Sequence, residues 1–307
     1  MQPIIEPIDR SLLEQELTHD KFVRNTNNGN NEIYIVTWHN APHVTREIGR
    51  LREITFRDAG GGTGKDCDLD EFDTAEEPFQ QLLVWNPRDK EIVGGYRFIH
   101  GNRLKVHENN RVDTPTAELF NFSSRFIADY LPYTIELGRS YVQPAYQPSI
   151  DIRKGMYSLD NIWNGLGAII KRHPDVKYFF GKITMYPHFN TEARDMILFF
   201  MKKYFGDNDK LVIPIHPLTQ NIDAKLLESI FVGGNYDKDY KILVQHVRLL
   251  NENIPPLVNA YMNLSSTMLC FGTSLNPEFG DVEETGILVT IDDIYDIKKE
   301  RHFMKPQ

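Results

Sequence analysis

The sequence predicts an α/β fold in which helices alternate with the strands of a mixed sheet. Segments with apolar residues at helical spacing alternate with short segments rich in β-branched and aromatic residues. Two strand-like segments also flank a polar turn, as in a β-hairpin. The composition, 41% hydrophobic and 25% charged residues, is that of a folded globular chain. This alternation favours helices packed on a sheet.

The first hundred residues predict two helices and three strands. A short helix is expected in RSLLEQELT and a strand in EIYIVTW. In HVTREIGRLREITFRDA, Val44, Ile48, Leu51 and Phe56 recur at near-helical spacing, so we expect an amphipathic helix that ends at the glycines 60–62. The hairpin follows as QQLLVWN, the turn PRDKE, and IVGGYRFIHG.

The remainder continues the alternation and then loosens. Helices are expected in TAELFNFSSRFIADYL, SLDNIWNGLGAIIKRHP, NTEARDMILFFMKKYFG and PPLVNAYMNL, and strands in YTIELGRSYVQP, VKYFFGKITMY and TGILVTIDDIY, with TMLCFGTSLNPEF irregular or extended. Proline- and aspartate-containing segments interrupt the pattern from about residue 207. We therefore expect a core at 1–206, an insertion or lid at 207–250, and elements at 251–307 that return to the core sheet.

Charge and cysteine content exclude several classes of protein. The 307 residues carry a net charge of -9 and no long basic run, so no nucleic-acid partner is expected. The N-terminus has no signal-peptide pattern, and no apolar run approaches the roughly 20 residues that span a bilayer. Cys67 and Cys270 lack metal-ligand spacing, which suits a reduced cytoplasmic protein without a disulfide.

The stretch GGGTGKDCDLDEFD, residues 60–73, resembles a nucleotide loop running into a calcium loop. A phosphate-binding glycine loop follows a strand and opens a helix, whereas these glycines follow a helix and lack the GxxxxGK[ST] spacing. An EF-hand loop needs a glycine at its sixth position, and DCDLDEFD has none there. Histidine spacings typical of metal sites are also missing, so we predict no catalytic metal.

Four groups of residues remain as candidates for chemistry. Taken singly, an arginine on a helix is typical of a solvated face, and an aspartate pair in a loop is typical of a turn or a helix cap. Their order and spacing along the chain are more specific than any one of them. The groups are Arg52 with Phe56, Asp70 with Asp73, Arg97 at the end of GGYR, and Glu136 with Arg139.

This skeleton, R-x3-F, D-x2-D, R and E-x2-R, resembles that of the acyl-homoserine-lactone synthases. FRDAGGGTGKDCDLDEFD, IVGGYRF and ELGRSYVQP more closely resemble the related lipid-forming N-acyltransferases: the ornithine-lipid synthases and the glycine-lipid synthases of the Bacteroides group, often called hemolysin-like. The resemblance covers about residues 33–190, and NIPPLVNAYMNL and FGTSLNPEFGDVE extend it. It implies a GNAT-like fold with a mostly antiparallel central sheet flanked by helices and a C-terminal extension.

The resemblance also implies roles for the charged residues of the loop and hairpin. Asp70 and Asp73 would lie beside Arg52 and Arg97 in a charge network that orders the glycine-rich loop near the acyl donor, with Phe56 in the same donor-binding set. Arginine pairs bidentately with carboxylates, which suits such a network. The alternative is a purely structural role in closing the loop.

Glu136 is the candidate general base, because amine attack on a thioester requires removal of the ammonium proton. Strict strand alternation would turn Glu136 and Gly138 to one face and Leu137 and Arg139 to the other. A β-bulge, common in this fold, would change that phase. Arg139 is expected either to bind pantetheine or an acidic carrier, or to bridge to an aspartate.

The donor is expected to lie along the segment from Val142 to Ser158, with anionic groups at the N-terminus of the following helix. Arg153 and Gly155 fall in this segment, but RKGMYS departs from the acetyltransferase signature [QR]-x-x-G-x-[GA]. This departure weakens acetyl-CoA as donor and favours acyl carrier protein, whose acidic surface could meet Arg153, Lys154, Lys171 and Arg172.

The leading hypothesis is an N-acyltransferase that moves a 3-hydroxylated acyl chain from acyl carrier protein to the amine of glycine, or second of ornithine, in aminolipid synthesis. It predicts no tightly bound cofactor, with acyl carrier protein or acyl-CoA as donor substrate. It also predicts a cytoplasmic protein with peripheral contact at the inner membrane. The alternatives are an acetyl-CoA-dependent GNAT acting on a small metabolite and a non-enzymatic, hemolysin-like lipid-binding protein.

Overall fold

The computed structural model describes residues 1–303 and divides the chain into two compact units. The first unit contains Met1–Arg103, Tyr133–Val176 and the segment that begins at Tyr295. The second contains Leu104–Pro132 and Lys177–Ile294. Both cysteines are free, Cys67 in the first unit and Cys270 in the second. Within residues 1–303, helices long and apolar enough to cross a membrane are not found.

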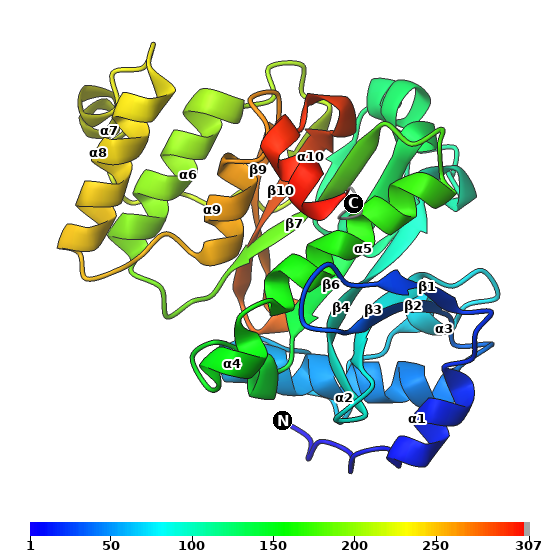
Figure 1. The fold of residues 1–307 in the computed structure, drawn as a ribbon. Coiled ribbons are helices and arrows are strands. Elements are labelled where there is room, and N and C mark those ends of the chain that lie inside the picture. Colours follow the sequence, from blue (N-terminus) through cyan, green and yellow to red (C-terminus); the bar gives the residue numbers. More distant parts are fainter. Residues whose placement is uncertain (304–307) are drawn as a thin grey trace. The chain divides into compact units, whose positions relative to one another are not determined.

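An antiparallel sheet forms the centre of the first unit (Figure 1). The predicted hairpin is β3 paired with β4, in which Gln81 lies opposite Arg97. Because partner residues of an antiparallel pair share one face, Gln81 and Arg97 point to the same side of the sheet. In spatial order its strands are β1 (Phe22–Asn25), β2 (Glu32–Val36), β3 (Gln80–Asn86), β4 (Glu91–His100) and β6 (Thr134–Val142).

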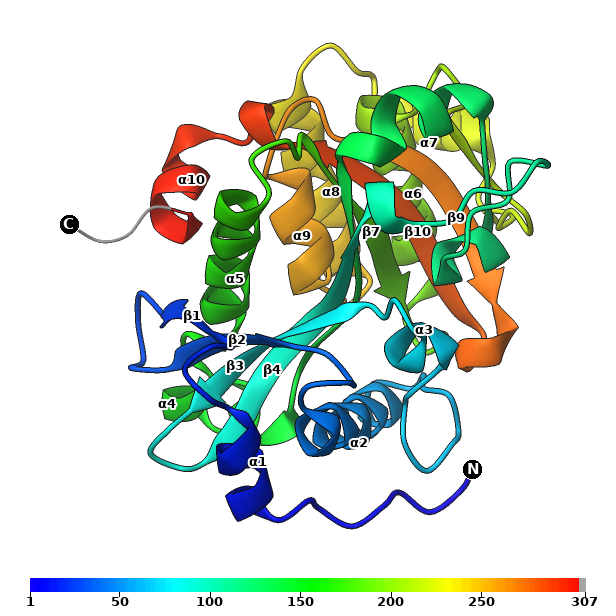
Figure 2. The same cartoon turned by 90° about the vertical axis from the view of Figure 1, so that its right-hand side faces the viewer.

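Two long helices lie on opposite sides of β3 and β4, as Figures 1 and 2 show. Helix α2 (Pro42–Asp58) lies on the side of Gln81 and Arg97, and α5 (Ser158–Arg172) lies on the other. Gly165 of α5 is so close to Leu82 that a Cβ would lie 2.5 Å from its methyl carbon. The shorter helices of this unit are α1 (Arg10–Glu16), α3 (Glu71–Thr74), α4 (Ile152–Gly155) and α10 (Asp296–His302).

A β-bulge interrupts the pairing of β4 with β6. Gly95 pairs with Tyr141 and Arg97 pairs with Gly138, so Arg139 and Ser140 together lie opposite Tyr96. Arg139 adopts a left-handed φ of 52°, which few non-glycine residues do. One extra residue in one strand is the definition of a bulge, and it changes the direction in which the following side chains point.

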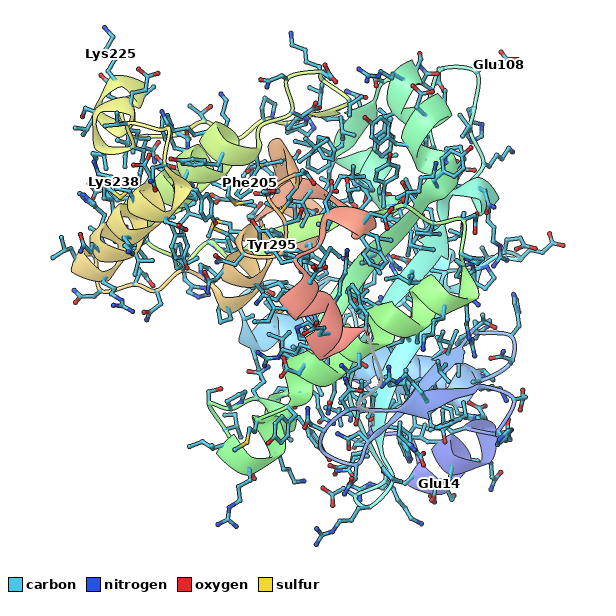
Figure 3. The ribbon with its side chains drawn as sticks, turned by 45° about the horizontal axis from the view of Figure 1, so that its top comes forward. Glu14, Glu108, Phe205, Lys225, Lys238 and Tyr295 are labelled. Atoms are coloured by element: carbon cyan, nitrogen blue, oxygen red, sulfur yellow. The ribbon has the colours of Figure 1, made fainter. Side chains whose placement is uncertain are left out.

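The second unit has two groups of antiparallel strands and four α-helices among its described residues. In one group β10 (Val282–Thr290) lies between β7 (Tyr178–Met185) and β9 (Leu269–Asn276), and in the other β5 (Phe120–Phe122) pairs with β8 (Val212–Pro214). On α7 and α8, Lys225 and Lys238 point away from the ribbon into solvent (Figure 3). The helices are α6 (Thr191–Phe205), α7 (Ala224–Ile230), α8 (Tyr236–Leu249) and α9 (Pro256–Met262).

The helix predicted over residues 116–131 is wrong. This segment holds a 3-10 turn (Pro115–Glu118), strand β5 and a π-helical turn (Phe126–Tyr130). In β5, Phe120 and Phe122 are buried and Asn121 between them is exposed, which is the period of two that a half-buried strand requires. Phe122, Phe126 and Tyr130 recur at a spacing of four residues, which is why the segment resembles a helical pattern.

Most other elements fall where the sequence predicts them. Strand β3 matches QQLLVWN, and α2, β4, β6, α5, β7 and α6 differ from their predicted segments by a few residues at the ends. TMLCFGTSLNPEF, expected to be irregular or extended, contains β9. Residues 207–250 contain β8, α7 and α8, and their role as a lid stays a prediction.

Candidate active site

The glycine-rich loop after α2 is tied to that helix by a single carboxylate. Glu53 of α2 accepts hydrogen bonds from the backbone amides of Thr63 (3.1 Å) and Gly64 (2.8 Å) and from the Thr63 hydroxyl (2.7 Å). Gly62 and Gly64 have φ values of 95° and 74°, which glycine adopts without a steric penalty. The backbone amides of Thr63 and Gly64 therefore donate to Glu53 of the protein itself. A phosphate-binding loop would instead direct such amides at a phosphate.

The D-x2-D pair forms the capping box of α3. The Asp70 carboxylate accepts from the amides of Phe72 (3.0 Å) and Asp73 (3.2 Å), and the Asp73 carboxylate accepts from the amide of Asp70 (3.2 Å). Such a box satisfies donors that the first turn of a helix would otherwise leave unpaired. The pair is thus a helix cap, as an aspartate pair in a loop typically is, and the box fixes both carboxylates for their contacts with Arg52 and Arg97.

Arg52 and Arg97 bind these carboxylates inside the first unit. Arg52 donates to both oxygens of Asp73, at 3.3 and 3.2 Å, in a bidentate pair. Arg97 donates through Nη1 to Asp70 at 2.7 Å and to Asp73 at 3.0 Å. The structure therefore brings together all four residues that the family resemblance placed in one charge network.

Asp68 extends the network to β6. Its carboxylate accepts from Arg52 Nε at 2.9 Å and from Arg139 Nε at 3.2 Å. Of the two roles expected for Arg139, a bridge to an aspartate is the one present in the structure. The result is a chain of alternating charges, which we call the Arg–Asp chain: Arg139, Asp68, Arg52, Asp73, Arg97 and Asp70.

Burial and the neighbouring arginines have opposite effects on the pKa values of the aspartates in the Arg–Asp chain. Arg52, Asp68 and Asp73 are at most 1% exposed. Burial alone would raise the pKa of Asp68, but the positive charges of Arg139 and then Arg52 outweigh it and hold this pKa below its usual value. Arg52 and Arg97 likewise lower the pKa of Asp73 against the effect of burial. The lowered pKa values keep the buried carboxylates of Asp68 and Asp73 ionised beside their arginines. With three arginines and three aspartates, the formal charges of the Arg–Asp chain cancel.

The sequence did not point to two residues of this region: Gln81, which binds the Arg–Asp chain, and Asp68, which belongs to it. Gln81 donates to Asp73 at 2.8 Å, and the hairpin register that pairs Gln81 with Arg97 could have identified it. Asp68 lies two residues before Asp70 in the same acidic loop, but nothing in the spacing distinguishes it from Asp66. The Arg97 guanidinium also lies 5.2 Å from the centre of the Phe79 ring, within the range of a cation–π contact.

Glu136 lies on the face of the sheet that carries the Arg–Asp chain. A Cβ on Gly138 would lie 3.7 Å from Arg97 Nε, so Gly138 faces Arg97, and Glu136, two residues earlier, faces the same side. Glu136 is 3% exposed. The strict alternation that would turn Arg139 to the other face is wrong, because the bulge begins at Arg139 and its side chain reaches Asp68.

The remaining predicted residues lie outside the Arg–Asp chain. Phe56 is buried on α2, and Val142 ends β6 with its carbonyl accepting from Gln147 Nε2 at 2.9 Å. Arg153 is an exposed residue of α4. Gly155 is required by packing, since a Cβ there would lie 2.4 Å from the nitrogen of Pro148. Donor binding by these four residues stays a prediction.

One group of side chains in the described residues has donors close enough for a metal ion. His100, His173 and Asp175 have ligand atoms within 4.8 Å of one another. The amide of Asn102, however, donates to His100 Nδ1 at 3.2 Å, which leaves the proton on Nε2 facing Asp175 at 3.0 Å. A metal on Nε2 would require a proton on Nδ1, so this contact fits a hydrogen-bonded imidazole better than a metal ligand.

Comparison with known proteins identifies the family. A model described as an acetyltransferase (GNAT) domain matches residues 51–153. Two curated proteins, from Phocaeicola vulgatus and Bacteroides thetaiotaomicron, are named glycine N(alpha)-acyltransferase. Each is 53% identical to this chain over 302 residues, which is 98% of this chain. The match covers 93% of the Phocaeicola protein and 90% of the Bacteroides protein. A solved CoA-dependent acyl-homoserine lactone synthase with SAM and isopentyl-CoA is 11% identical over 89% of this chain and 90% of its own, with a TM-score of 0.38, a likeness too low to support an argument. From the two curated relatives, the chain belongs to the glycine N(alpha)-acyltransferase family and is an N-acyltransferase with a GNAT domain.

Proposed function

We propose that this N-acyltransferase moves a long, 3-hydroxylated acyl chain from acyl carrier protein to the amine of glycine, as a step of aminolipid synthesis. The names of the two relatives at 53% identity support glycine as the acceptor, with ornithine second. The product would carry a long acyl chain and a free carboxylate. Such an amphiphile favours a cytoplasmic enzyme that touches the inner membrane peripherally. Membership of an acyltransferase family speaks against the alternative of a non-enzymatic lipid-binding protein.

The observation that carries the proposal is a buried carboxylate, Glu136, next to a bulge on the strand that also joins the Arg–Asp chain. In the proposed reaction the amine nitrogen attacks the thioester carbonyl carbon, and a C–N bond forms while the C–S bond breaks. The ammonium group gives up two protons in becoming an amide. Glu136 takes the first, directly or through a water, before attack, and one proton ends on the departing thiolate while the other leaves to solvent.

Positioning supplies much of the remaining rate enhancement in this account. Backbone amides of the bulged strand β6 would polarise the thioester carbonyl as negative charge develops on its oxygen. The Arg–Asp chain, whose own charges cancel, would hold β6, β4 and the glycine-rich loop in one arrangement around the reacting groups. In this scheme Arg97 and Arg52 order the donor site, and Phe56 contributes an apolar surface to it.

The N-terminus of α4 is not open to a coenzyme A diphosphate, which favours acyl carrier protein as donor. Coenzyme A presents a diphosphate, which GNAT proteins commonly bind with backbone amides at a helix N-terminus. In α4 the amides of Arg153 and Lys154 instead donate to the Asp151 carboxylate, at 2.9 and 3.0 Å. A carrier-bound pantetheine has no such diphosphate, and Arg153 remains exposed for contact with an acidic carrier.

The test presents one 3-hydroxyacyl chain on acyl carrier protein and on coenzyme A to the purified protein, with glycine or ornithine as acceptor. Mass spectrometry of the products measures N-acylation. We expect the highest kcat/KM with the carrier-bound chain and glycine. Turnover of acetyl-CoA with a small amine, without turnover of either long-chain donor, would instead establish the small-metabolite alternative.

A further inference from the structure

Arg139 occupies a backbone conformation that its own side chain disfavours. Its φ of 52° lies in the left-handed region, within a strand and at a bulge, where glycine is the usual residue. A non-glycine residue stays in such a conformation only when its surroundings hold it there, and such positions gather at functional sites. A contact of Arg139 with its surroundings must therefore stabilise this conformation.

The Asp68 carboxylate makes that contact. Arg139 Nε donates to Oδ1 of Asp68 at 3.2 Å and lies 3.1 Å from Oδ2 in the same ion pair. Asp68 is 1% exposed, whereas the Arg139 side chain is 19% exposed. Because one partner is fully shielded from water, this pair is screened less than a surface pair would be. The Arg139 side chain is therefore largely covered, and the ion pair holds its Nε against the Asp68 carboxylate.

Asp68 is itself held in place from two directions. Its backbone amide donates to the carbonyl of Gly49 on α2 at 3.1 Å, and its carboxylate accepts from Arg52 of the same helix at 2.9 Å. Gly49 allows the loop to approach, since a Cβ there would lie 2.6 Å from Cys67 Sγ and 2.8 Å from Leu69 Cγ. Helix α2 therefore determines where the Asp68 carboxylate meets β6.

We propose that Asp68 is a positioning residue for acyl transfer: it holds Arg139 in the left-handed bulge and so fixes the segment of β6 that runs from Glu136 to Val142. This inference rests on the proposed function, in which that segment carries the general base and the amides that polarise the thioester. Asp68 does not touch the substrate in this scheme. It acts through Arg139, and its loss misplaces the strand without removing a reacting group.

The direct test compares Asp68→Asn with Asp195→Asn under steady-state conditions, using the acyl donor and acceptor that the wild type turns over fastest. Asp195 is also a fully buried aspartate paired with an arginine, Arg194 at 2.7 Å, but it belongs to the second unit and is not a member of the Arg–Asp chain. We expect Asp68→Asn to lower kcat by about 100-fold with KM for the amine nearly unchanged, because misplacement by about 1 Å can cost that much. Asp195→Asn should keep the wild-type kcat per folded molecule.

A second measurement reports the conformation of β6 without activity. Hydrogen exchange should become faster at Ser140 and Tyr141 in Asp68→Asn and stay unchanged in β3. Asp68→Glu, which keeps the charge, should recover part of the loss in kcat, and it serves as the test variant if Asp68→Asn does not fold. Wild-type kcat with wild-type exchange in the folded Asp68 variants would overturn the inference.

The two proposals fail in different ways. If the wild-type protein does not acylate glycine, the proposed function fails, and the Asp68 comparison is then made with the acceptor that the wild type does use. If the wild type acylates glycine and Asp68→Asn does so equally fast, only the positioning role fails.

Discussion

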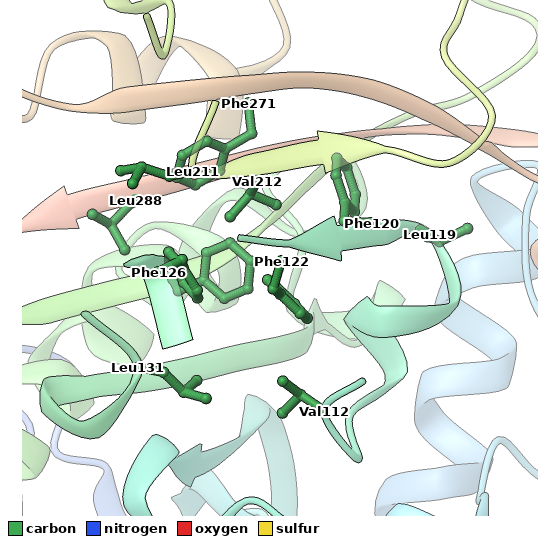
Figure 4. Close-up of a cluster of buried hydrophobic side chains, with 11 residues drawn as sticks. Val112, Leu119, Phe120, Phe122, Phe126, Leu131, Leu211, Val212, Phe271 and Leu288 are labelled. Carbon is green, nitrogen blue, oxygen red and sulfur yellow. The ribbon is translucent and has the colours of Figure 1, made fainter. Parts of the chain in front are cut away.

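The interiors of the two units are built on different principles. In the first unit three arginines and three aspartates meet in the Arg–Asp chain, contributed by α2, the following loop, α3, β4 and β6. In the second unit the comparable cluster is apolar, and Figure 4 shows Phe120, Phe122 and Phe126 facing Phe271 and Leu288 of β9 and β10. The ion pairs of the first unit require specific directions between their charged groups. The apolar cluster of the second unit depends on the shape and volume of its side chains.

The difference indicates what each interior is for. A buried ion pair contributes little net stability over an apolar pair of the same size, but breaking it is costly because an unpaired charge remains. An apolar cluster tolerates exchange among residues of similar volume. The Arg–Asp chain therefore fixes positions more than it adds stability, whereas the aromatic cluster mainly stabilises its unit. Substitutions in the Arg–Asp chain should therefore affect turnover, whereas substitutions in the aromatic cluster should affect stability alone.

The largest effect is expected from Arg52→Leu. It leaves Asp68 and Asp73 buried without their shared partner, and breaking such pairs costs about 3–5 kcal/mol of folding free energy. Urea denaturation measures this loss. The matched control is Arg10→Ala, which removes an exposed arginine from its pair with Glu91 and should cost about 0–1 kcal/mol. Equal losses in the two variants would mean that burial does not distinguish the Arg–Asp chain from a surface pair.

A smaller effect, confined to stability, is expected from Phe126→Leu. Phe126 is fully buried and its ring lies 5.4 Å from that of Phe180 and 5.3 Å from that of Phe122. Losing part of the ring should cost about 1–3 kcal/mol. Turnover per folded molecule should match the wild type. A loss of turnover as large as that of Asp68→Asn would remove the functional distinction between the two interiors.

The smallest expected effect is a loss of folding stability as the pH falls. The pKa values of Asp68 and Asp73 are lower in the folded protein than in the unfolded chain, where aspartate titrates near 4. Their contribution is therefore complete above about pH 5, and it is lost as the pH falls through 4 towards the folded values. Unfolding midpoints measured from pH 6 to pH 3 should fall in wild type and, in parallel, in Phe126→Leu. A flat profile below pH 4 would contradict this electrostatic account.

The sequence allowed prediction of those features whose signal is local. The helical spacing of Val44, Ile48 and Leu51 gave α2, and the polar turn gave the β3–β4 hairpin. The family resemblance gave Arg52, Asp70, Asp73 and Arg97, which meet in the structure as expected.

What could not be predicted depends on contacts between distant segments. Asp68 pairs with Arg139 only because α2 holds the acidic loop against β6. No periodic pattern in the sequence indicates this contact. The left-handed conformation of Arg139 is equally hidden, because left-handed positions usually favour glycine. Strand β5 was mistaken for helix because three residues are too few to establish a period of two.

The role of Glu136 in N-acylation is tested by comparing the lipids of cells that express the wild-type chain with those of cells that express Glu136→Gln. Mass spectrometry of the extracts identifies N-acyl amino acids and the acceptor they carry. We predict new N-acylglycines with the wild type and a sharp reduction with Glu136→Gln, although both proteins are folded. Identical extracts, with both proteins folded, would contradict it and would favour the acetylation of a small metabolite.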